Sequence, residues 1–153
     1  MNKRPDLHFV LASGRSRPAS AQIRENLDIV KRTNTESILC NGCIIYDYDN
    51  SILWQGILSP EFLKKVHKLY KPSPESVYFY CVGDDAILYD EEWARRLRDE
   101  YEEQTVVENM EEYIEKIESG QVKINKVGFL IPDRSKADGM YYKIHDFIYF
   151  TLN

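Results

Sequence analysis

The pattern of apolar and polar positions predicts a strand followed by a helix at the start of the chain. Residues 7–12 form a continuous apolar run, which is typical of a strand buried on both faces. From Ala19 to Val30, apolar residues recur at helical spacing and indicate one amphipathic helix. A buried strand that turns into a helix is typical of α/β proteins, which bind ligands at such strand ends.

The middle of the chain predicts antiparallel strands and capped helices. Asn41 and Gly42 lie between two apolar arms and both tolerate a positive φ, so they predict a two-residue hairpin. Ser59 and Asp90 each precede a helical pattern and are candidate N-caps. The remaining strands are expected at residues 51–58, 77–82, 86–89 and 124–131, with helices at residues 60–70, 90–101 and 110–120 and a final helix or strand at residues 140–150.

This order of elements predicts an α/β fold with two lobes. Residues 1–56 contain a strand, a helix, a second strand and a hairpin, which form one edge of a doubly wound sheet. Residues 57–153 mix hairpins with helices and are expected to form a separate α+β lobe, which is incomplete. A chain of 153 residues is long enough to bury one good core or two small ones.

Charge and composition exclude several classes of protein. A net charge of -5 argues against a general nucleic-acid binder, which needs clustered Lys and Arg. No apolar run approaches the length of a membrane span, and the N-terminal residues lack the apolar core of a secretory signal. Three cysteines are an odd number in such a chain, which favours free thiols in a reducing compartment and predicts a cytoplasmic protein.

The end of the first strand is the best candidate site. Ser13 and Gly14 close the apolar run, and the helix that follows is expected to present free N–H groups beyond the strand end. The Ser13 hydroxyl and the Arg15 guanidinium are close to that point in sequence. This combination predicts a site for a small anion such as phosphate.

Other polar groups have simpler structural interpretations. Cys40 and Cys43 have the spacing of metal ligands, but a zinc site needs four ligands, so structural thiols are favoured. His67 lies among lysines on a helix and indicates a solvated face. Tyr78 and Tyr80 alternate along one strand, which favours packing over a sugar-binding pocket.

Three segments in order resemble the Cof-type branch of the haloacid dehalogenase-like hydrolases. They are residues 12–15 (Ala-Ser-Gly-Arg) after the first strand, residues 40–47 (Cys-Asn-Gly-Cys-Ile-Ile-Tyr-Asp), and residues 57–62 (Ile-Leu-Ser-Pro-Glu-Phe) at the start of a helix. The resemblance implies a partial Rossmann-like core edge followed by an α+β cap lobe. It also implies Mg²⁺-dependent hydrolysis of phosphate esters, in which an Asp nucleophile attacks phosphorus and a second Asp acts as acid and base.

The resemblance also assigns roles to residues of this sequence. It implies that Ser13, Gly14 and Arg15 bind phosphate and that Asn41 and Gly42 form a hairpin on the substrate side. In the family, a late Lys stabilises the charge and a late acidic motif holds Mg²⁺. Cys43 departs from the family's usual Ala at this point.

Other family motifs have no clear match. The Asp-x-Asp-Gly-Thr strand lies well upstream of the serine strand in the family, and only six residues precede Leu7. Residues 47–50 and residues 82–85 imitate acidic motifs but are better explained as turns, and Lys136 as a solvated loop residue. We therefore expect a truncated or degenerate member of a Mg²⁺-dependent phosphatase family, with no cofactor bound by this chain and no turnover by it alone.

Two partners and two alternative functions stay open. The implied ligand is a small phosphorylated metabolite, such as a sugar phosphate. Residues 7–12 are expected to have an unpaired edge and an apolar face, which predicts self-association or a protein partner along this strand. One alternative function is a non-catalytic binding or protein-interaction module, a pseudoenzyme. The other is a two-chain enzyme in which a partner polypeptide supplies the Asp strand.

Overall fold

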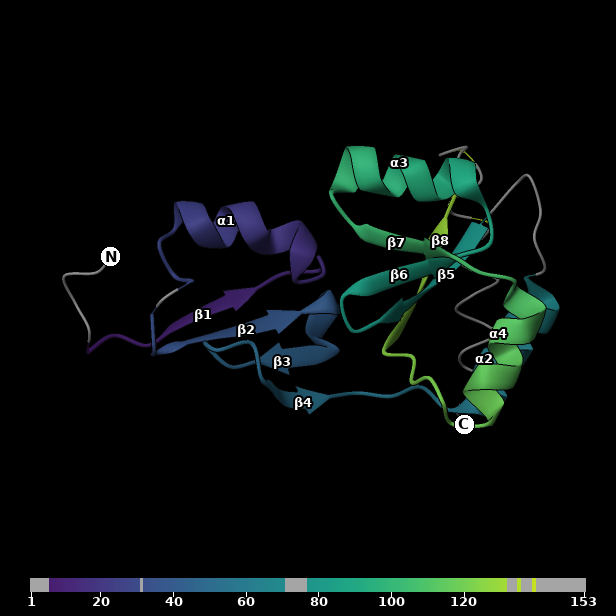
Figure 1. The fold of residues 1–153 in the computed structure, drawn as a ribbon, viewed down its shortest axis with the longest axis horizontal. Coiled ribbons are helices and arrows are strands. Elements are labelled where there is room, and N and C mark those ends of the chain that lie inside the picture. Colours follow the sequence, from purple (N-terminus) through teal and green to yellow (C-terminus); the bar gives the residue numbers. More distant parts are fainter. Residues whose placement is uncertain (1–5, 31, 71–76, 132–134, 136–138, 140–153) are drawn as a thin grey trace.

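The computed structural model describes residues 6–30, 32–70 and 77–131, together with Ser135 and Gly139. Within them the chain forms two four-stranded sheets, which lie next to each other in Figure 1. The element expected at residues 140–150 lies outside the described residues, as does Lys136.

The first sheet has the order β1-β2-β3-β4, with β1 and β4 at its two edges. Strands β1 and β2 are parallel, whereas β2 pairs antiparallel with β3 and β3 with β4. A short helical connection joins β1 to β2, as parallel pairing requires. The elements are β1 (Phe9–Ala12), η1 (Pro18–Ser20), α1 (Ala21–Asn26), β2 (Thr35–Leu39), η2 (Cys40–Gly42), β3 (Ile44–Tyr46) and β4 (Ile52–Gln55).

The second sheet has the order β7-β6-β5-β8 and is covered by helices on both faces (Figure 1). Leu97 of α3 packs on one face, whereas Leu63 of α2 and Ile114 of α4 belong to the cluster on the other face. Strand β7 was not expected from the sequence. The elements are α2 (Pro60–Leu69), β5 (Val77–Val82), β6 (Asp85–Leu88), α3 (Glu91–Tyr101), β7 (Gln104–Val107), α4 (Met110–Glu118) and β8 (Lys126–Leu130).

Tyrosines form much of the core of the second sheet. Tyr78 and Tyr80 are buried between the sheet and helices α2 and α4, and their ring centroids are 5.4 Å apart. The expectation of packing at these positions is confirmed. The expected caps are also present, since the Ser59 side chain accepts from the Phe62 amide and the Asp90 side chain accepts from the Trp93 amide.

The first strand and helix differ from expectation. Strand β1 is not buried on both faces: half-buried and exposed residues alternate along it, and Val10 is 51% exposed. Helix α1 is only six residues long, and Ile23 and Val30 are exposed instead of forming its buried stripe. The helical spacing was real, but a single short helix cannot cover more than part of a small sheet.

The hairpin at Asn41 and Gly42 forms, although with a longer turn than expected. Leu39 of β2 pairs with Ile44 of β3, so four residues connect the strands. Cys40, Asn41 and Gly42 all have positive φ values, of 53°, 60° and 88°. No helix among the described residues has the length and apolar character of a membrane span.

Candidate active site

The predicted serine loop and the β2–β3 turn lie against each other. The Ser13 amide donates to the Ile38 carbonyl at 2.9 Å, and the Asn41 amide donates to the Ser13 carbonyl at 3.3 Å. The Cys40 amide donates to the Arg15 carbonyl at 2.9 Å. Parallel pairing of β1 and β2 therefore brings residues that are 28 positions apart, Ser13 and Asn41, to one end of the sheet.

Gly14 permits this close approach. A Cβ at Gly14 would lie 3.0 Å from Nδ2 of Asn41, tighter than an ordinary van der Waals contact. Both residues were singled out in sequence, and the structure brings them together. Gly42 lies in the same turn with a φ of 88°, a conformation that side chains disfavour.

Ser13 is held by its own turn and not by a helix N-terminus. The Ser13 hydroxyl accepts from the Arg15 amide at 3.2 Å. Helix α1 begins only at Ala21 and follows η1, so the expectation that free helix N–H groups serve this loop is wrong. Hydroxyl, amide and side-chain cations of the loop itself must therefore supply any affinity for an anion.

Three carboxylates of the second lobe bind the residues that follow Gly14. Glu102 accepts from the Arg15 guanidinium at 3.4 Å, and Glu103 accepts from the Ser16 hydroxyl at 2.5 Å. Asp84, in the β5–β6 turn, accepts from the Arg17 guanidinium. The loop thus joins the two sheets through charged contacts that sequence reasoning missed.

Asp84 also accepts from the Tyr46 hydroxyl at 3.1 Å, so one carboxylate joins two elements of the first lobe. The hydrogen bond to Asp84 raises the pKa of Arg17 above its usual value. Burial, and then the nearby Asp84 charge, raise the pKa of Tyr46. We call Arg17, Tyr46 and Asp84 the interlobe triad.

Lys126 is a further cation at the loop that the sequence did not single out. It is the first residue of β8, and its Nζ donates to Asn41 Oδ1 at 2.8 Å and to the Gly14 carbonyl at 3.3 Å. Both acceptors are neutral oxygens. The ammonium group therefore adds positive charge next to Gly14.

A cavity of about 330 Å³ lies between this loop and the second sheet. Its lining comes from both lobes; it consists of Gly14, Ser16, Cys40, Phe79, Cys81, Leu97, Tyr101, Glu103, Lys126, Gly128, Phe129 and Leu130. We call it the interlobe cavity. It borders the residue next to Ser13, so a group bound at Ser13 has space beside it.

Two cysteines line the interlobe cavity as protonated thiols. Burial raises the pKa of Cys40 to about 11 and the pKa of Cys81 to about 12. A thiol acts as a nucleophile through its thiolate, so neither residue is activated at neutral pH. The sequence suggested a two-residue hairpin with Cys40 and Cys43 on either side of it. This is wrong, because both cysteines lie within the four-residue turn.

In the part of the chain that the structure describes, the side chains around this loop do not form a ligand set for Mg²⁺. Mg²⁺ prefers carboxylate and other oxygen ligands, and in residues 6–30, 32–70 and 77–131 no group of three or more acidic, His or Cys side chains could hold a metal. The carboxylates nearest the loop are bound to Arg15, Ser16 and Arg17.

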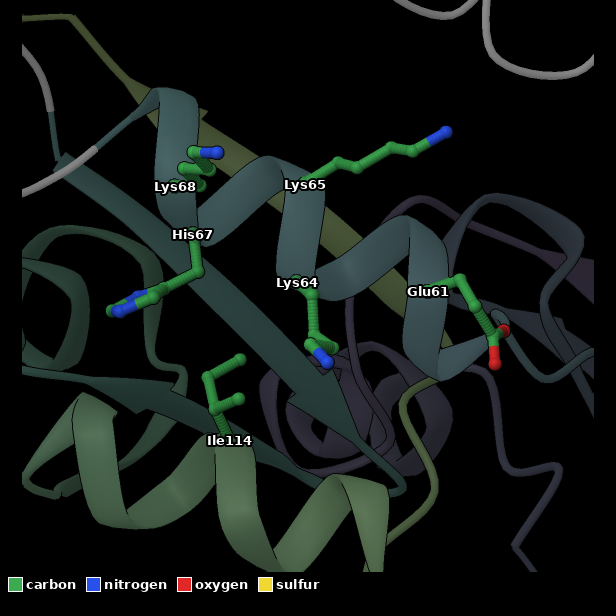
Figure 2. A pocket seen from close by; sticks show the side chains of 6 residues that line it. All are labelled: Glu61, Lys64, Lys65, His67, Lys68 and Ile114. Carbon is green, nitrogen blue, oxygen red and sulfur yellow. The ribbon is translucent and has the colours of Figure 1, made fainter.

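A second hollow lies between α2 and α4 on the far side of the second sheet. It measures about 470 Å³, and Figure 2 shows Ile114 directed from α4 toward α2 while Lys65 points away. The expectation of a solvated His67 is wrong: the residue is buried, and its Nδ1 lies 2.6 Å from the Tyr78 hydroxyl. Lys64, which also lines this hollow, pairs with Glu118 and so joins α2 to α4.

The serine loop lies at the end of the parallel strand pair β1–β2, and the second sheet faces it across the interlobe cavity. The sequence pattern of the haloacid dehalogenase-like hydrolases matches residues 2–151, and the chain belongs to this family. The resemblance and the fold class expected from the sequence are thus confirmed.

Individual relatives agree with this assignment. The chain is 28% identical over 149 residues to an uncharacterized hydrolase of Schizosaccharomyces pombe, covering 89% of this chain and 45% of the yeast protein. A haloacid dehalogenase-like hydrolase from B. subtilis has a similar fold, with a TM-score of 0.71 and 16% identity over 94% of this chain and 56% of the other. A Thermotoga maritima protein gives a TM-score of 0.66 and 19% identity over 92% of this chain and 50% of its own. The chain thus spans about half the length of these relatives.

Proposed function

We propose that this chain binds the phosphate group of a small phosphorylated metabolite, as a member of the haloacid dehalogenase-like phosphatases. The observation that supports the proposal is that Lys126 reaches Gly14, next to Ser13, at the close contact of Gly14 with Asn41. A hydroxyl and an ammonium group complement the charged oxygens of a phosphate monoester. Ser13 is the residue expected to contact a phosphoryl oxygen directly.

The second lobe covers this loop and forms the wall opposite it. Lys126 from β8 reaches Gly14, and the interlobe cavity continues from there across the second sheet. The phosphate would lie at the loop and the organic part of the ester in the cavity. On this proposal, residues 1–56 hold the phosphate and the lobe that begins at residue 57 forms the wall over the organic part.

A binding role without turnover is a second candidate function. The observation that favours it is the engagement of Glu102, Glu103 and Asp84 with the loop's own donors. A carboxylate that already accepts a charged hydrogen bond is a poor nucleophile, and Asp attack is the step that the family requires. On this proposal the ester stays intact when this chain acts alone.

The test is a titration of the full chain with inorganic phosphate, in which binding is monitored through the amide chemical shifts in NMR spectra. The expected result is saturable binding that Ser13→Ala weakens by about tenfold, the loss of one hydrogen bond to a charged group. Ser51→Ala, an exposed serine in the turn before β4, is the matched control and should bind like the parent. Unchanged affinity in Ser13→Ala would contradict phosphate binding at this loop.

Turnover decides between the two candidate functions. The full chain is incubated with p-nitrophenyl phosphate and Mg²⁺, and release of nitrophenol is measured. Phosphate binding without nitrophenol release supports the binding role. Release that Ser13→Ala abolishes supports a hydrolase and contradicts the proposal that this chain alone leaves the ester intact.

A further inference from the structure

The chain passes from the first lobe to the second between β4 and α2, and we call residues 56–58 the interlobe crossing. The Gly56 amide donates to the Cys43 carbonyl, in the turn between β2 and β3, at 2.9 Å. The Leu58 amide donates to the Ile124 carbonyl at 2.8 Å, and Ile124 is buried in the core of the second lobe. The backbone of the interlobe crossing is therefore bonded both to a turn of the first lobe and to the segment before β8.

Asn125 joins the same segments through its side chain. Its Nδ2 donates to the Gly56 carbonyl at 2.9 Å and to Oε1 of Gln55, the last residue of β4, at 3.2 Å. Its Oδ1 accepts from the Gly83 amide, in the turn between β5 and β6, at 2.9 Å. The residue is 4% exposed, so this amide is buried with its N–H donors and its oxygen all bonded. A buried polar group that is fully bonded favours one arrangement of the segments that it joins.

Asn125 is followed directly by Lys126, the lysine that reaches the serine loop. The Lys126 backbone is fixed within the second lobe, because it pairs with Cys81 of β5. The acceptors of its ammonium group, Gly14 and Asn41, belong to the first lobe. A lysine has a long flexible stem that does not by itself hold the charge in one place. The position of the ammonium group therefore depends on how residue 126 is held relative to the first lobe.

The contacts of Asn125 differ in kind from the ion pairs between the lobes. Arg15 with Glu102, and Arg17 with Asp84, are partly exposed pairs in which one partner is a long side chain. Such a side chain can keep its partner while the two backbones shift. The Asn125 amide is short, buried and bonded directly to backbone groups of the interlobe crossing and of the β5–β6 turn. It therefore fixes the backbone positions themselves.

We propose that Asn125 is a positioning residue for the phosphate site: its amide fixes the start of β8 against the interlobe crossing and so holds the ammonium group of Lys126 at the serine loop. This role rests on the proposed phosphate site, in which Lys126 complements the charge of the ligand. Asn125 does not touch the phosphate. Its effect on affinity passes through Lys126, so the two residues should be energetically coupled.

The first experiment needs no ligand and follows the side-chain amide resonances of Asn41 in NMR spectra of the full chain. Lys126→Met should shift these resonances, because the ammonium group no longer donates to Asn41 Oδ1. Asn125→Ala should shift them in the same direction, and adding it to Lys126→Met should produce no further change. The positioning role is overturned if Asn125→Ala leaves the Asn41 resonances where they are in the parent, or if Lys126→Met does.

Asn109→Ala is the matched control for a loss of stability. Asn109 caps α4 in the same lobe, and its side chain accepts from the Glu111 amide at 3.1 Å. Loss of such a cap destabilises a protein without moving a distant site. Asn109→Ala should therefore leave the Asn41 resonances and the phosphate affinity unchanged. A purely structural role predicts that Asn125→Ala behaves like Asn109→Ala.

Isothermal titration calorimetry with inorganic phosphate measures the consequence for the site. Asn125→Ala should weaken binding about threefold to tenfold in the parent and not at all in Lys126→Met. Lys123→Met, at an exposed lysine before β8, is the control for the charge of Lys126 and should bind like the parent. Equal losses from Asn125→Ala in both backgrounds would overturn the positioning role and leave the phosphate site standing. If the parent binds no phosphate, the proposed phosphate site is wrong, and the Asn41 resonances still decide whether Asn125 positions Lys126.

Discussion

Removal of the Asp84 charge should loosen the contact between the two lobes. Asp84→Asn keeps the shape of the side chain and one acceptor oxygen for the Tyr46 hydroxyl. It replaces the other carboxylate oxygen with an NH₂ group, which faces the donors of Arg17. In the parent protein, Nε of Arg17 donates to both carboxylate oxygens of Asp84, at 3.2 and 2.9 Å. Asp84→Asn removes one of these two acceptors.

The magnitude follows from the partial burial of the pair. The Arg17 side chain is 35% exposed and the Asp84 side chain 21%, so the pair is neither a surface contact nor a core contact. Fully exposed pairs contribute about 0–1 kcal/mol, and breaking a buried pair costs about 3–5 kcal/mol. We expect Asp84→Asn to lower the free energy of unfolding by about 1–2 kcal/mol, part of which is the loss of charge-assisted hydrogen bonds.

Urea unfolding followed by circular dichroism measures the effect. The matched control is Glu102→Gln, because Glu102 pairs with Arg15 across the same interface at 3.4 Å, with side chains 57% and 42% exposed. This change should cost less than about 0.5 kcal/mol. Added salt should reduce the difference in free energy of unfolding between Asp84→Asn and the parent only slightly, because half-buried charges are weakly screened. The reasoning is refuted if Glu102→Gln destabilises the protein as much as Asp84→Asn does.

Three further predictions concern the thiols, the buried histidine and the edge strand. An unfolded thiol ionises near pH 9, whereas burial raises the pKa of Cys40 to about 11. The free energy of unfolding should therefore fall as the pH rises from about 9 to about 11. Cys40→Ala should make this fall smaller when unfolding is measured under reducing conditions. His67→Leu should cost about 1–3 kcal/mol in thermal unfolding because it removes the histidine partner of the buried Tyr78 hydroxyl. Adding Tyr78→Phe should recover part of the loss, and additive losses would exclude coupling. If the chain associates along the β1 edge, Val10→Lys should reduce its mass in light scattering while Val107→Lys on β7 should not; a monomeric parent would contradict this association.

Local elements of this fold could be predicted because their causes lie within a few residues. The Ser59 and Asp90 caps bond to amides three positions later, and the Asn41-Gly42 turn needs only its own positive φ values. The tyrosines of β5 were correctly expected to pack, although β5 is covered on both faces and not on one. For the caps and the turn, the sequence contains both partners of the interaction in one short window.

Burial was less predictable, because periodicity shows which residues share a face and not what covers that face. Ile23 and Val30 have helical spacing but are exposed, since α1 is short and lies on a small sheet. His67 has lysines around it in sequence, yet it is buried because α4 packs against α2 and Tyr78 offers its hydroxyl. The element that covers His67, α4, is distant in the chain, and no described element covers Ile23 or Val30.

For the site, the sequence by itself determined the serine loop and the hairpin beside it. Ser13, Gly14, Arg15 and Asn41 were singled out from the strand end and the family resemblance, and parallel pairing of β1 with β2 is enough to bring them together. Only the tertiary structure decided what faces them. Lys126 reaches Gly14 across 112 positions, and Glu103 reaches Ser16 across 87. Such contacts depend on how two separately formed sheets dock, and no short-range pattern of residues encodes that docking.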